Sequence, residues 1–449
     1  MLRKSLLASV AAASIVAASS TAYAGAFGLR EQSADGQGLS FAGAAAGGAG
    51  LGSMFWNPAT MTDYQGIQAS ATGTLVLPYA KLTNGTGSGA SYAGLGAGFG
   101  ASSNSGNEGL SALVPAGYFS WQLNDSLWAG LSVNAPFGLG TKPDASWSGR
   151  DYNSTTSIAS LNVSPTVAYK FNEMISVAAG VNFMSLKAKY TSAYPALANP
   201  STWSVLGMKG DGMAFGFNLG ATIKPTSTTE IGFGYRSGMS VKVDGDFFGY
   251  SVSAVNAPVK TTIPLPQSIN VGIKQKVTAD WTLLAGLEWT DWSVLKAPAV
   301  TYAANGLAHS VLPSIPFYYK DGWYASLGAE YQWNANLTLR SGLGYEWTPV
   351  RDAERSARLP DNDRLWTSVG LGYKLSNQLN LDFGYTHIFP KATMVTLDSN
   401  NHNQNVNLSA GLQTLVAKVD SHIDIVSLGL TYRFDTPTSA TKLPGKVTK

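Results

Sequence analysis

The chain has 449 residues, of which 45% are hydrophobic and 13% are charged, with a formal net charge of +3 and no cysteine. Without cysteine, disulfides and thiolate metal sites are excluded, and the small, scattered basic charge argues against nucleic acid as a partner. Soluble proteins usually carry about 25% charged residues, so part of this exterior must face something other than water.

The first residues carry two early cations, Arg3 and Lys4, then a short apolar run and Ala22-Tyr23-Ala24. This pattern is typical of a secretory signal peptide, so we expect residues 1–24 to be cleaved off after Ala24. An apolar helix that stays on the chain is less favoured, because the run is short and rich in Ala and Ser. No later segment approaches the roughly 18 continuous apolar residues of a spanning helix.

Residues 25–65, the N-terminal segment, are rich in glycine and alanine and hold too few β-forming residues to add strands. They include Phe55, Trp56 and the stretch Asn57-Pro58-Ala59. We expect this segment to turn back as a hatch, with Asn57 satisfying backbone groups and Pro58 fixing a turn. The alternative is a disordered periplasmic extension, and the two aromatic side chains argue against it.

From residue 66 onward one hairpin pattern recurs, for example in YFSWQLNDSLWAGLSVN and GAEYQWNANLTLRSGLGYEW. Tight turns alternate with long stretches rich in Gly, Ser, Asn and Pro at residues 83–111, 140–155, 191–208, 303–318 and 398–419. An even number of about 14 strands, joined by alternating short turns and long loops, is typical of outer-membrane barrels. We therefore predict an all-β fold, a 14-stranded antiparallel transmembrane β-barrel over residues 66–434 with an N-terminal hatch plugging the lumen.

Alternation within the strands predicts which side chains face the membrane. In residues 281–291, Trp281, Leu283, Leu287 and Trp289 share one face. Aromatic residues at both ends of such faces fit two interfaces around a hydrocarbon slab. The opposite faces carry both signs of charge, which indicates structural ion pairs and not a one-sign ion filter; the predicted lumen-facing residues are Glu230, Arg236, Lys274, Glu288, Glu330, Arg340, Glu346, Asp382 and Arg433.

The last predicted strand, near residues 420–434, ends on the alternating stretch VSLGLTYRF, a usual terminus of such barrels. A polar tail follows over residues 435–449, with Lys442, Lys446 and Lys449. We expect this tail to lie in the periplasm.

Nothing in the sequence indicates an enzyme. The four histidines, His309, His387, His402 and His422, show no metal-binding spacing, and no Gly-x-Ser-x-Gly elbow is present. No catalytic residues, metal or cofactor are therefore expected. No nucleotide-binding motif is present either, so any transport would run down a gradient.

Several stretches, in the same order, resemble the FadL/OmpP1/TodX family of outer-membrane transporters for long-chain fatty acids and other hydrophobic compounds. They are Asn57-Pro58-Ala59, NAPFGLGTKPDASWSGR at 134–150, GYRSGMSVKVDGDF at 234–247 and LPDNDRLWTSVGLGY at 359–373. The resemblance implies a hatch that carries the Asn-Pro-Ala motif. It also implies a kink in the third strand, through which ligand leaves sideways into the membrane.

The implied kink falls at Pro136, Phe137 and Gly138. Proline has no N–H for a β-ladder, so the residue chemistry also predicts a local loss of pairing there, and Pro115 and Pro165 invite the same interpretation for the neighbouring strands. The alternative is that Pro136 only marks where the strand enters a loop.

Ligand-binding candidates come from two sources. The stretch at 194–208 is unusually apolar for an exposed loop and predicts a capture groove with Leu197, Trp203 and Leu206. The resemblance implies cations for a carboxylate at Lys187 and Lys320, with Arg351 as a further candidate. Strand alternation places Lys187 on the outward face, and the alternative for each cation is an interfacial, snorkelling role.

We therefore expect a monomeric outer-membrane transporter for passive uptake of hydrophobic compounds, most of all long-chain fatty acids. Aromatic or aliphatic hydrocarbons are an alternative substrate class, and a general porin is an alternative function. Expected partners are the hydrophobic ligand, outer-membrane lipid with lipopolysaccharide, and the barrel-assembly machinery.

Overall fold

The structure, a computed structural model, describes residues 25–85, 102–196, 199–249, 256–310, 312–403 and 414–434. The predicted signal peptide and the predicted tail lie outside these residues. Within them, no helix is long and apolar enough to cross a membrane.

The described residues form nineteen strands of a single antiparallel sheet. In chain order these are β1 (Ile67–Asn84), β2 (Ala112–Gln122), β3 (Leu127–Asn134), β4 (Gly138–Thr141), β5 (Thr155–Lys170), β6 (Ile175–Ala196), β7 (Asn199–Thr226), β8 (Thr229–Arg236), β9 (Met239–Gly249), β10 (Ala257–Leu265), β11 (Ser268–Lys276), β12 (Trp281–Thr290), β13 (Val300–Tyr302), β14 (Gly322–Gln332), β15 (Leu337–Trp347), β16 (Arg364–Lys374), β17 (Leu379–Pro390), β18 (Thr393–Leu397) and β19 (Leu415–Arg433). Two short 3-10 helices, η5 (Trp292–Val294) and η6 (Asp352–Glu354), lie in loops.

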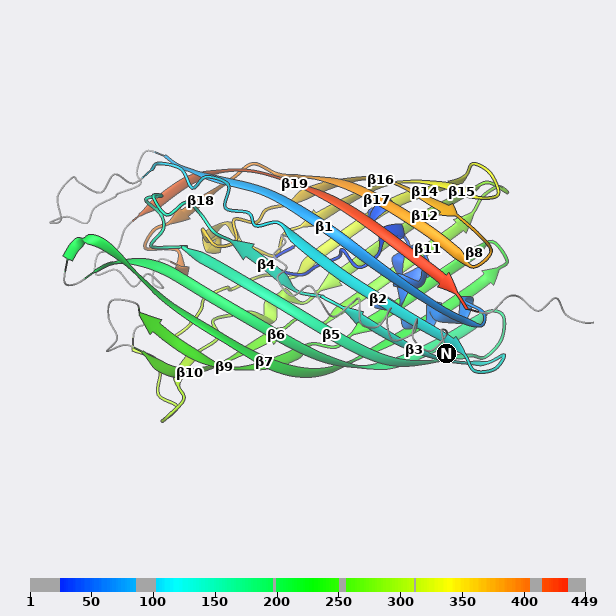
Figure 1. Cartoon of the computed structure of the whole chain (residues 1–449), viewed down its shortest axis with the longest axis horizontal. Coiled ribbons are helices and arrows are strands. Elements are labelled where there is room, and N and C mark those ends of the chain that lie inside the picture. Colours follow the sequence, from blue (N-terminus) through cyan, green and yellow to red (C-terminus); the bar gives the residue numbers. More distant parts are fainter. Residues whose placement is uncertain are drawn as a thin grey trace, which may run out of the picture.

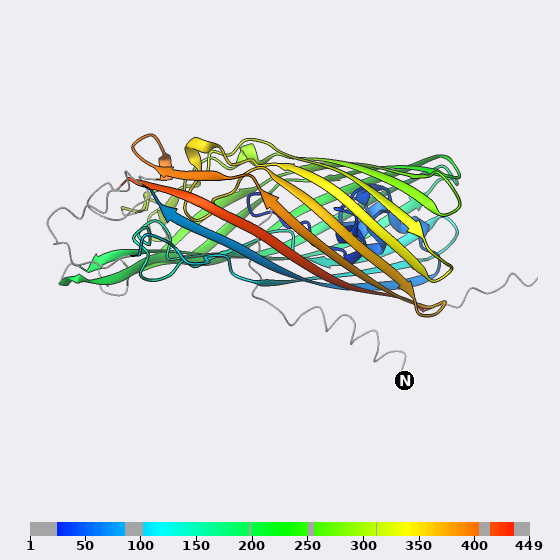
Figure 2. The same cartoon turned by 90° about the horizontal axis from the view of Figure 1, so that it is seen from above.

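These nineteen strands make fourteen wall positions, because five positions are each formed by two consecutive strands: β3 with β4, β8 with β9, β10 with β11, β12 with β13, and β17 with β18. The first and last strands pair from Gln68–Arg433 to Asn84–Ala417 and close the barrel, as Figure 2 shows. Long loops gather at one end and short turns at the other (Figure 1). The predicted closed 14-stranded antiparallel barrel is confirmed.

Side chains of the wall alternate between membrane and lumen as predicted. On β12, Trp281, Leu283 and Leu287 are exposed on the outer face, while Leu284 is buried inside. Exposed aromatic side chains form one band near the turns and another near the loops, with aliphatic residues between them; they include Trp121, Trp281, Trp333 and Tyr373 at the turn end and Trp323, Trp347 and Phe389 at the loop end.

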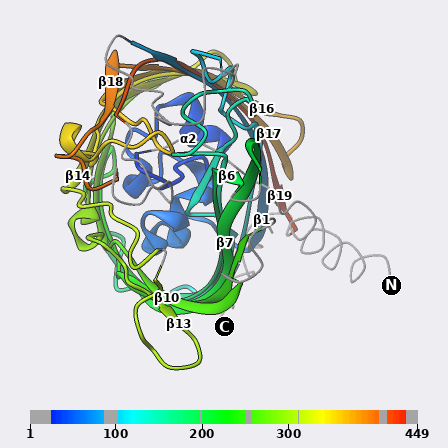
Figure 3. The same cartoon turned by 90° about the vertical axis from the view of Figure 1, so that its left-hand side faces the viewer.

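The N-terminal segment, residues 25–65, lies inside the barrel, where Figure 3 shows its coils enclosed by the wall. It contains α2 (Ala34–Gly38) and the 3-10 helices η1 (Ala44–Ala46), η2 (Gly50–Phe55) and η3 (Pro58–Asp63). Ser33 caps α2 by accepting a hydrogen bond from the Gly36 N–H. The segment meets many strands of the wall, among them β7, β8, β11, β16 and β17.

Glycines on the inner face let this segment lie directly against the wall. An added Cβ at Gly232 would overlap the carbonyl oxygen of Ala45, and one at Gly234 would overlap that of Trp56. Other inner glycines make similar close approaches to the segment: Gly130, Gly220, Gly272, Gly286, Gly328, Gly342, Gly370 and Gly384. Because the contacts reach the segment's backbone, side-chain rotation could not relieve a larger residue at Gly232 or Gly234.

Most of the predicted lumenal charges form ion pairs, as the sequence suggested. Arg340 contacts Glu330 at 3.0 Å and Asp382 at 2.8 Å. Lys224 of β7 pairs with Asp63 of the N-terminal segment. Such pairs satisfy charges that the lumen shields from water.

Candidate ligand-binding site

The third wall position is interrupted between β3 and β4, at residues 135–137. Pro136 has no N–H, and its carbonyl accepts a hydrogen bond from the Leu29 N–H at 2.8 Å. The Gly138 N–H donates to the Phe27 carbonyl at 2.9 Å. Residues of the N-terminal segment thus provide the backbone hydrogen-bond partners that a neighbouring strand would otherwise provide.

The neighbouring strand β2 is left partly unpaired beside this break. Its ladder with β3 runs only from Gly117–Val133 to Gln122–Trp128, whereas its ladder with β1 continues up to Ala112. The strand above the break, β4, pairs with β5. In the described residues, Ala112–Ala116 therefore has a ladder partner on the β1 side alone.

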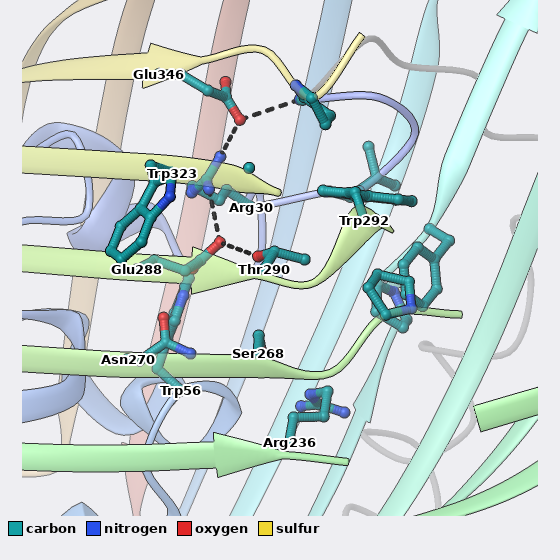
Figure 4. Close-up of a pocket in the computed structure, with 18 of the residues that line it drawn as sticks. Arg30, Trp56, Arg236, Ser268, Asn270, Glu288, Thr290, Trp292, Trp323 and Glu346 are labelled. Carbon is teal, nitrogen blue, oxygen red and sulfur yellow. Dashed lines mark hydrogen bonds and ion pairs between the residues drawn. The ribbon is translucent and has the colours of Figure 1, made fainter. Parts of the chain in front are cut away.

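A cavity of about 80 Å³, the inner chamber, lies in the lumen next to the break (Figure 4). The N-terminal segment supplies Arg30 to it, and Arg30 pairs with Glu288 at 2.6 Å and with Glu346 at 2.7 Å. Aromatic and polar side chains alternate around the cavity, which is lined by Leu29, Arg30, Phe55, Trp56, Pro136, Phe137, Arg236, Ser268, Asn270, Glu288, Thr290, Trp292, Trp323, Glu346 and Trp347, among others.

A second cavity, the outer chamber, has a volume of about 80 Å³ and lies nearer the loops. Its walls are largely apolar and include Phe27, Leu139, Ile158, Ala188, Ile263, Pro298, Ile315, Pro316, Phe317 and Leu359. The lining is typical of a site for a hydrophobic small molecule with a few polar contacts.

Arg358 is the buried cation of the outer chamber, with 7% of its surface exposed. Its guanidinium lies 3.8 Å from the centre of the Tyr190 ring and donates to the Ser192 hydroxyl at 3.1 Å. Burial lowers the pKa of Arg358 from its usual range. None of the ion pairs among the described residues includes it, although the buried Asp151 carboxylate acts on it electrostatically. Its Nε has no hydrogen-bond partner among the described residues, so a ligand carboxylate could bind there.

An aromatic cluster, the aromatic partition, separates the two chambers. The Phe27 ring lies 4.8 Å from Trp292, 5.9 Å from Phe137 and 6.3 Å from Phe317, measured between ring centres. Phe27 and Phe317 line the outer chamber, while Phe137 and Trp292 line the inner one. A molecule that moves between the chambers must displace these rings.

The predicted hatch motif lies at the inner wall. Asn57 Oδ1 accepts from the Ala59 N–H at 3.0 Å, and Asn57 Nδ2 donates to the carbonyls of Ala45 at 2.7 Å and Ala221 at 2.9 Å. Pro58 occupies the first turn of η3, where its missing N–H costs nothing. Asn57 therefore ties two turns of the N-terminal segment to β7.

The three predicted carboxylate cations do not come together in either chamber. Lys187 is exposed on the outer face of β6, as its alternation predicts. Lys320 and Arg351 are exposed and share a shallow hollow with Trp323 and Trp347 of the loop-end band. That placement is typical of interfacial cations.

The prediction of a loop at residues 191–208, with a groove in it, is wrong, because the structure forms strands there. Residues 191–196 and 199–208 extend β6 and β7 as one long hairpin, because alternating Tyr190, Leu206 and Met208 pack into a buried cluster with Phe247. Leu206 is buried there, outside both chambers. Leu197 lies outside the described residues, and Trp203 lies in β7 at a position whose side chain is not described.

Arg358, Phe27 and Trp292 were missed in the sequence. Arg358 immediately precedes the stretch LPDNDRLWTSVGLGY, so its position next to a recognisable motif was the available signal. Phe27 gave none, because an isolated aromatic residue near a predicted cleavage site has no periodic context.

Comparison with known proteins gives a consistent result. Residues 15–434 match the family model described as outer membrane protein transport protein (OMPP1/FadL/TodX). A long-chain fatty acid transport protein of Escherichia coli is 26% identical over 425 residues, covering 86% of this chain and 92% of its own. Outer membrane protein P1 of Haemophilus influenzae is 27% identical over 420 residues, covering 85% and 89% respectively.

Solved structures show the same fold. A FadL homologue of Pseudomonas aeruginosa superposes with a TM-score of 0.79 at 22% identity, covering 92% of this chain and all of its own. The toluene transporter TodX of P. putida gives a TM-score of 0.63 at 16% identity, covering 89% and 98%. At these identities the likeness concerns the barrel architecture.

Proposed function

Because the chain belongs to the OMPP1/FadL/TodX family of outer-membrane transport proteins, we propose that it takes up long-chain fatty acids by passive diffusion through its two chambers. The observation that carries the proposal is the outer chamber, an apolar cavity with one buried arginine that forms no ion pair with any described residue. No energy-coupling motif is present in the sequence, so the concentration gradient would drive uptake.

The outer chamber has the chemistry to hold an amphipathic acid. Each methylene buried against its aliphatic and aromatic lining would contribute about 0.8 kcal/mol. The carboxylate would form a charge-assisted hydrogen bond with Arg358, whose hydrogen bond to Ser192 and ring contact with Tyr190 involve neutral groups. Glu354 also lines this chamber; its Oε1 lies 2.8 Å from His402 Nδ1, and among the described residues it forms no ion pair with the arginine.

We propose release at the interruption between β3 and β4. The inner chamber is lined by Pro136 and Phe137, and the adjoining part of β2 lacks a ladder partner on that side. An apolar molecule that leaves there enters hydrocarbon and avoids the polar interior of the turn end. The N-terminal segment, which fills the lumen below, is proposed to act as the hatch.

Hydrocarbon uptake is the second candidate, because the apolar lining of the outer chamber would also accept an uncharged ligand. Arg358 favours the acid, since a neutral ligand would leave its guanidinium without an anion. The relatives bear transporter names, which agrees with a protein that is not an enzyme. Secretion by signal peptide, insertion by the assembly machinery and contact with lipopolysaccharide remain part of the proposal.

The test is uptake of radiolabelled palmitate and of toluene by cells that lack their own transporter and express this chain. Palmitate uptake above that of cells with empty vector is expected. Arg358→Gln should weaken palmitate binding by roughly tenfold or more, the loss expected for one hydrogen bond to a charged group, while Arg358→Lys should retain most of it. Toluene uptake without palmitate uptake would support the hydrocarbon alternative.

The porin alternative has a separate test. Purified protein in a planar bilayer should show little steady ion current, because the N-terminal segment fills the lumen. A large steady current in the unmodified protein would support a general diffusion pore.

A further inference from the structure

Arg236 of β8 is a buried cation without a carboxylate partner, and it lines the inner chamber beside the break. Its exposed fraction is 8%, and none of the ion pairs among the described residues includes it. The other arginine of the chamber, Arg30, is held between two carboxylates. Figure 4 shows Arg236 on the opposite side of the cavity from that ion-paired group.

The hydrogen bonds of Arg236 orient its guanidinium but involve neutral groups, and the Glu288 carboxylate that acts on it electrostatically is paired with Arg30. One Nη donates to Asn182 Oδ1 at 3.2 Å, the other donates to the Phe55 carbonyl at 3.0 Å, and the Phe55 ring centre lies 4.4 Å away. A buried charge needs a compensating charge or strong hydrogen bonds. Neutral acceptors compensate it only in part, so an incoming anion would be favoured.

A row of buried asparagines leads from Arg236 to the break. Asn182 Oδ1 accepts from Asn162 Nδ2 at 3.4 Å, and Asn162 Nδ2 donates to Asn134 Oδ1 at 3.2 Å. Asn134 is the last residue of β3, next to Ala135 and Pro136. The Nδ2 groups of Asn134 and Asn182 are buried with no hydrogen-bond partner among the described residues, a situation that bound water or a ligand usually explains.

We propose that Arg236 is a second carboxylate site, at which the headgroup of a long-chain acid rests in the inner chamber before release. The unpartnered amide donors of the asparagine row extend this site toward the break. The ligand class is thus a monocarboxylate with an apolar tail, and a neutral molecule of the same length gains nothing from the site. The inference rests on the proposed function.

The test compares palmitate with hexadecanol, which has the same chain length and no charge, in cells that express the full chain. Arg236→Gln is expected to slow initial palmitate uptake by about tenfold, the effect of one lost charge-assisted hydrogen bond, and to leave hexadecanol uptake unchanged. Arg236→Lys should recover most palmitate uptake. Lys242→Gln is the matched control, since it removes one positive charge from the outer face of β9, the continuation of β8.

The outcomes separate the two proposals. If the unmodified protein takes up no palmitate, the proposed function fails. If it does, but Arg236→Gln slows both compounds equally or neither, the second carboxylate site is overturned, because a merely structural role would affect acid and alcohol alike. Heat-dependent gel mobility shows whether each variant is folded.

A measurement on the unmodified protein covers the case of a variant that does not fold. In a crystal structure with 16-bromopalmitate, carboxylate density within hydrogen-bond reach of Arg236 is expected. Ligand density in the inner chamber with the bromine end at Arg236 would overturn the site.

Discussion

Residues 25–32 and residues 33–65 belong to one continuous segment but contact the barrel in different ways. The first part hydrogen-bonds to the broken wall through Leu29 and Phe27, and Phe27 forms the aromatic partition. The second part packs its backbone against inner glycines and is tied to β7 by Asn57. The first part borders the proposed ligand path, whereas the second fills the space beneath it.

This difference separates two tasks that a blocked barrel must perform. A filler needs many fixed contacts so that ions and water cannot pass. A partition in a ligand path needs a few contacts that an apolar molecule can replace with its own. The backbone contacts of residues 33–65 and the ring contacts of Phe27 match these two requirements.

The largest expected effect comes from displacing the filler. Gly234→Val would place its side chain on the Trp56 carbonyl, and overpacking of this kind costs about 1–3 kcal/mol or more. We expect the variant to pass a large, steady ion current in planar bilayers. Gly73→Val is the control, because Gly73 is exposed on the outer face of β1 with space around it. If the folded Gly234→Val barrel passed as little ion current as this control, the filler role would be contradicted.

A smaller, different effect is expected from the partition. Phe27→Ala removes a ring that contacts Trp292, Phe137 and Phe317, and each aromatic pair contributes about 0.5–1.5 kcal/mol beyond its buried area. Because Phe27 also lines the outer chamber, the variant offers a bound apolar tail less surface, and palmitate affinity should fall by roughly tenfold, with ion current still low. Equilibrium binding and bilayer recording measure the two quantities, with Phe389→Ala of the outer face as control. A rise in ion current equal to that of Gly234→Val would erase the distinction between the two parts.

The wall break gives a further, moderate prediction. Pro136→Val supplies an N–H that can pair and so favours a closed wall by about 1 kcal/mol. Initial palmitate uptake should fall by roughly fivefold, the rate equivalent of that free energy. Pro258→Val, at an exposed position of β10, is the control. Unchanged uptake in the Pro136 variant would count against release at this position.

The smallest effect is expected at Lys187. Because its side chain lies on the outer face of β6 and lines neither chamber, Lys187→Gln should leave palmitate uptake and binding within about twofold of the unmodified protein, as for most surface substitutions. A larger loss of binding would restore the carboxylate role that the family resemblance implied.

The barrel could be predicted from sequence because strand alternation has a period of two residues, so that Trp281, Leu283 and Leu287 reveal their common face without any neighbour. The lumenal charges followed from the same rule. The chambers could not be predicted in this way. Arg358 meets Tyr190 and Ser192 across a large separation in the chain, and Phe27 meets Trp292 likewise; no local period encodes such contacts. Lys320 and Arg351 lie outside the strands, where alternation gives no direction.

The inner glycines have a consequence for engineering. The inner wall is complementary in shape to the backbone of residues 33–65, and this fit depends on positions such as Gly232, Gly234 and Gly342. In a chimaera that joins this barrel to a relative's N-terminal segment, or this segment to another barrel, the inner glycines and the segment backbone would no longer match. Exchange of cargo specificity between such proteins is therefore best attempted by grafting chamber residues such as Arg358, with segment and wall kept together.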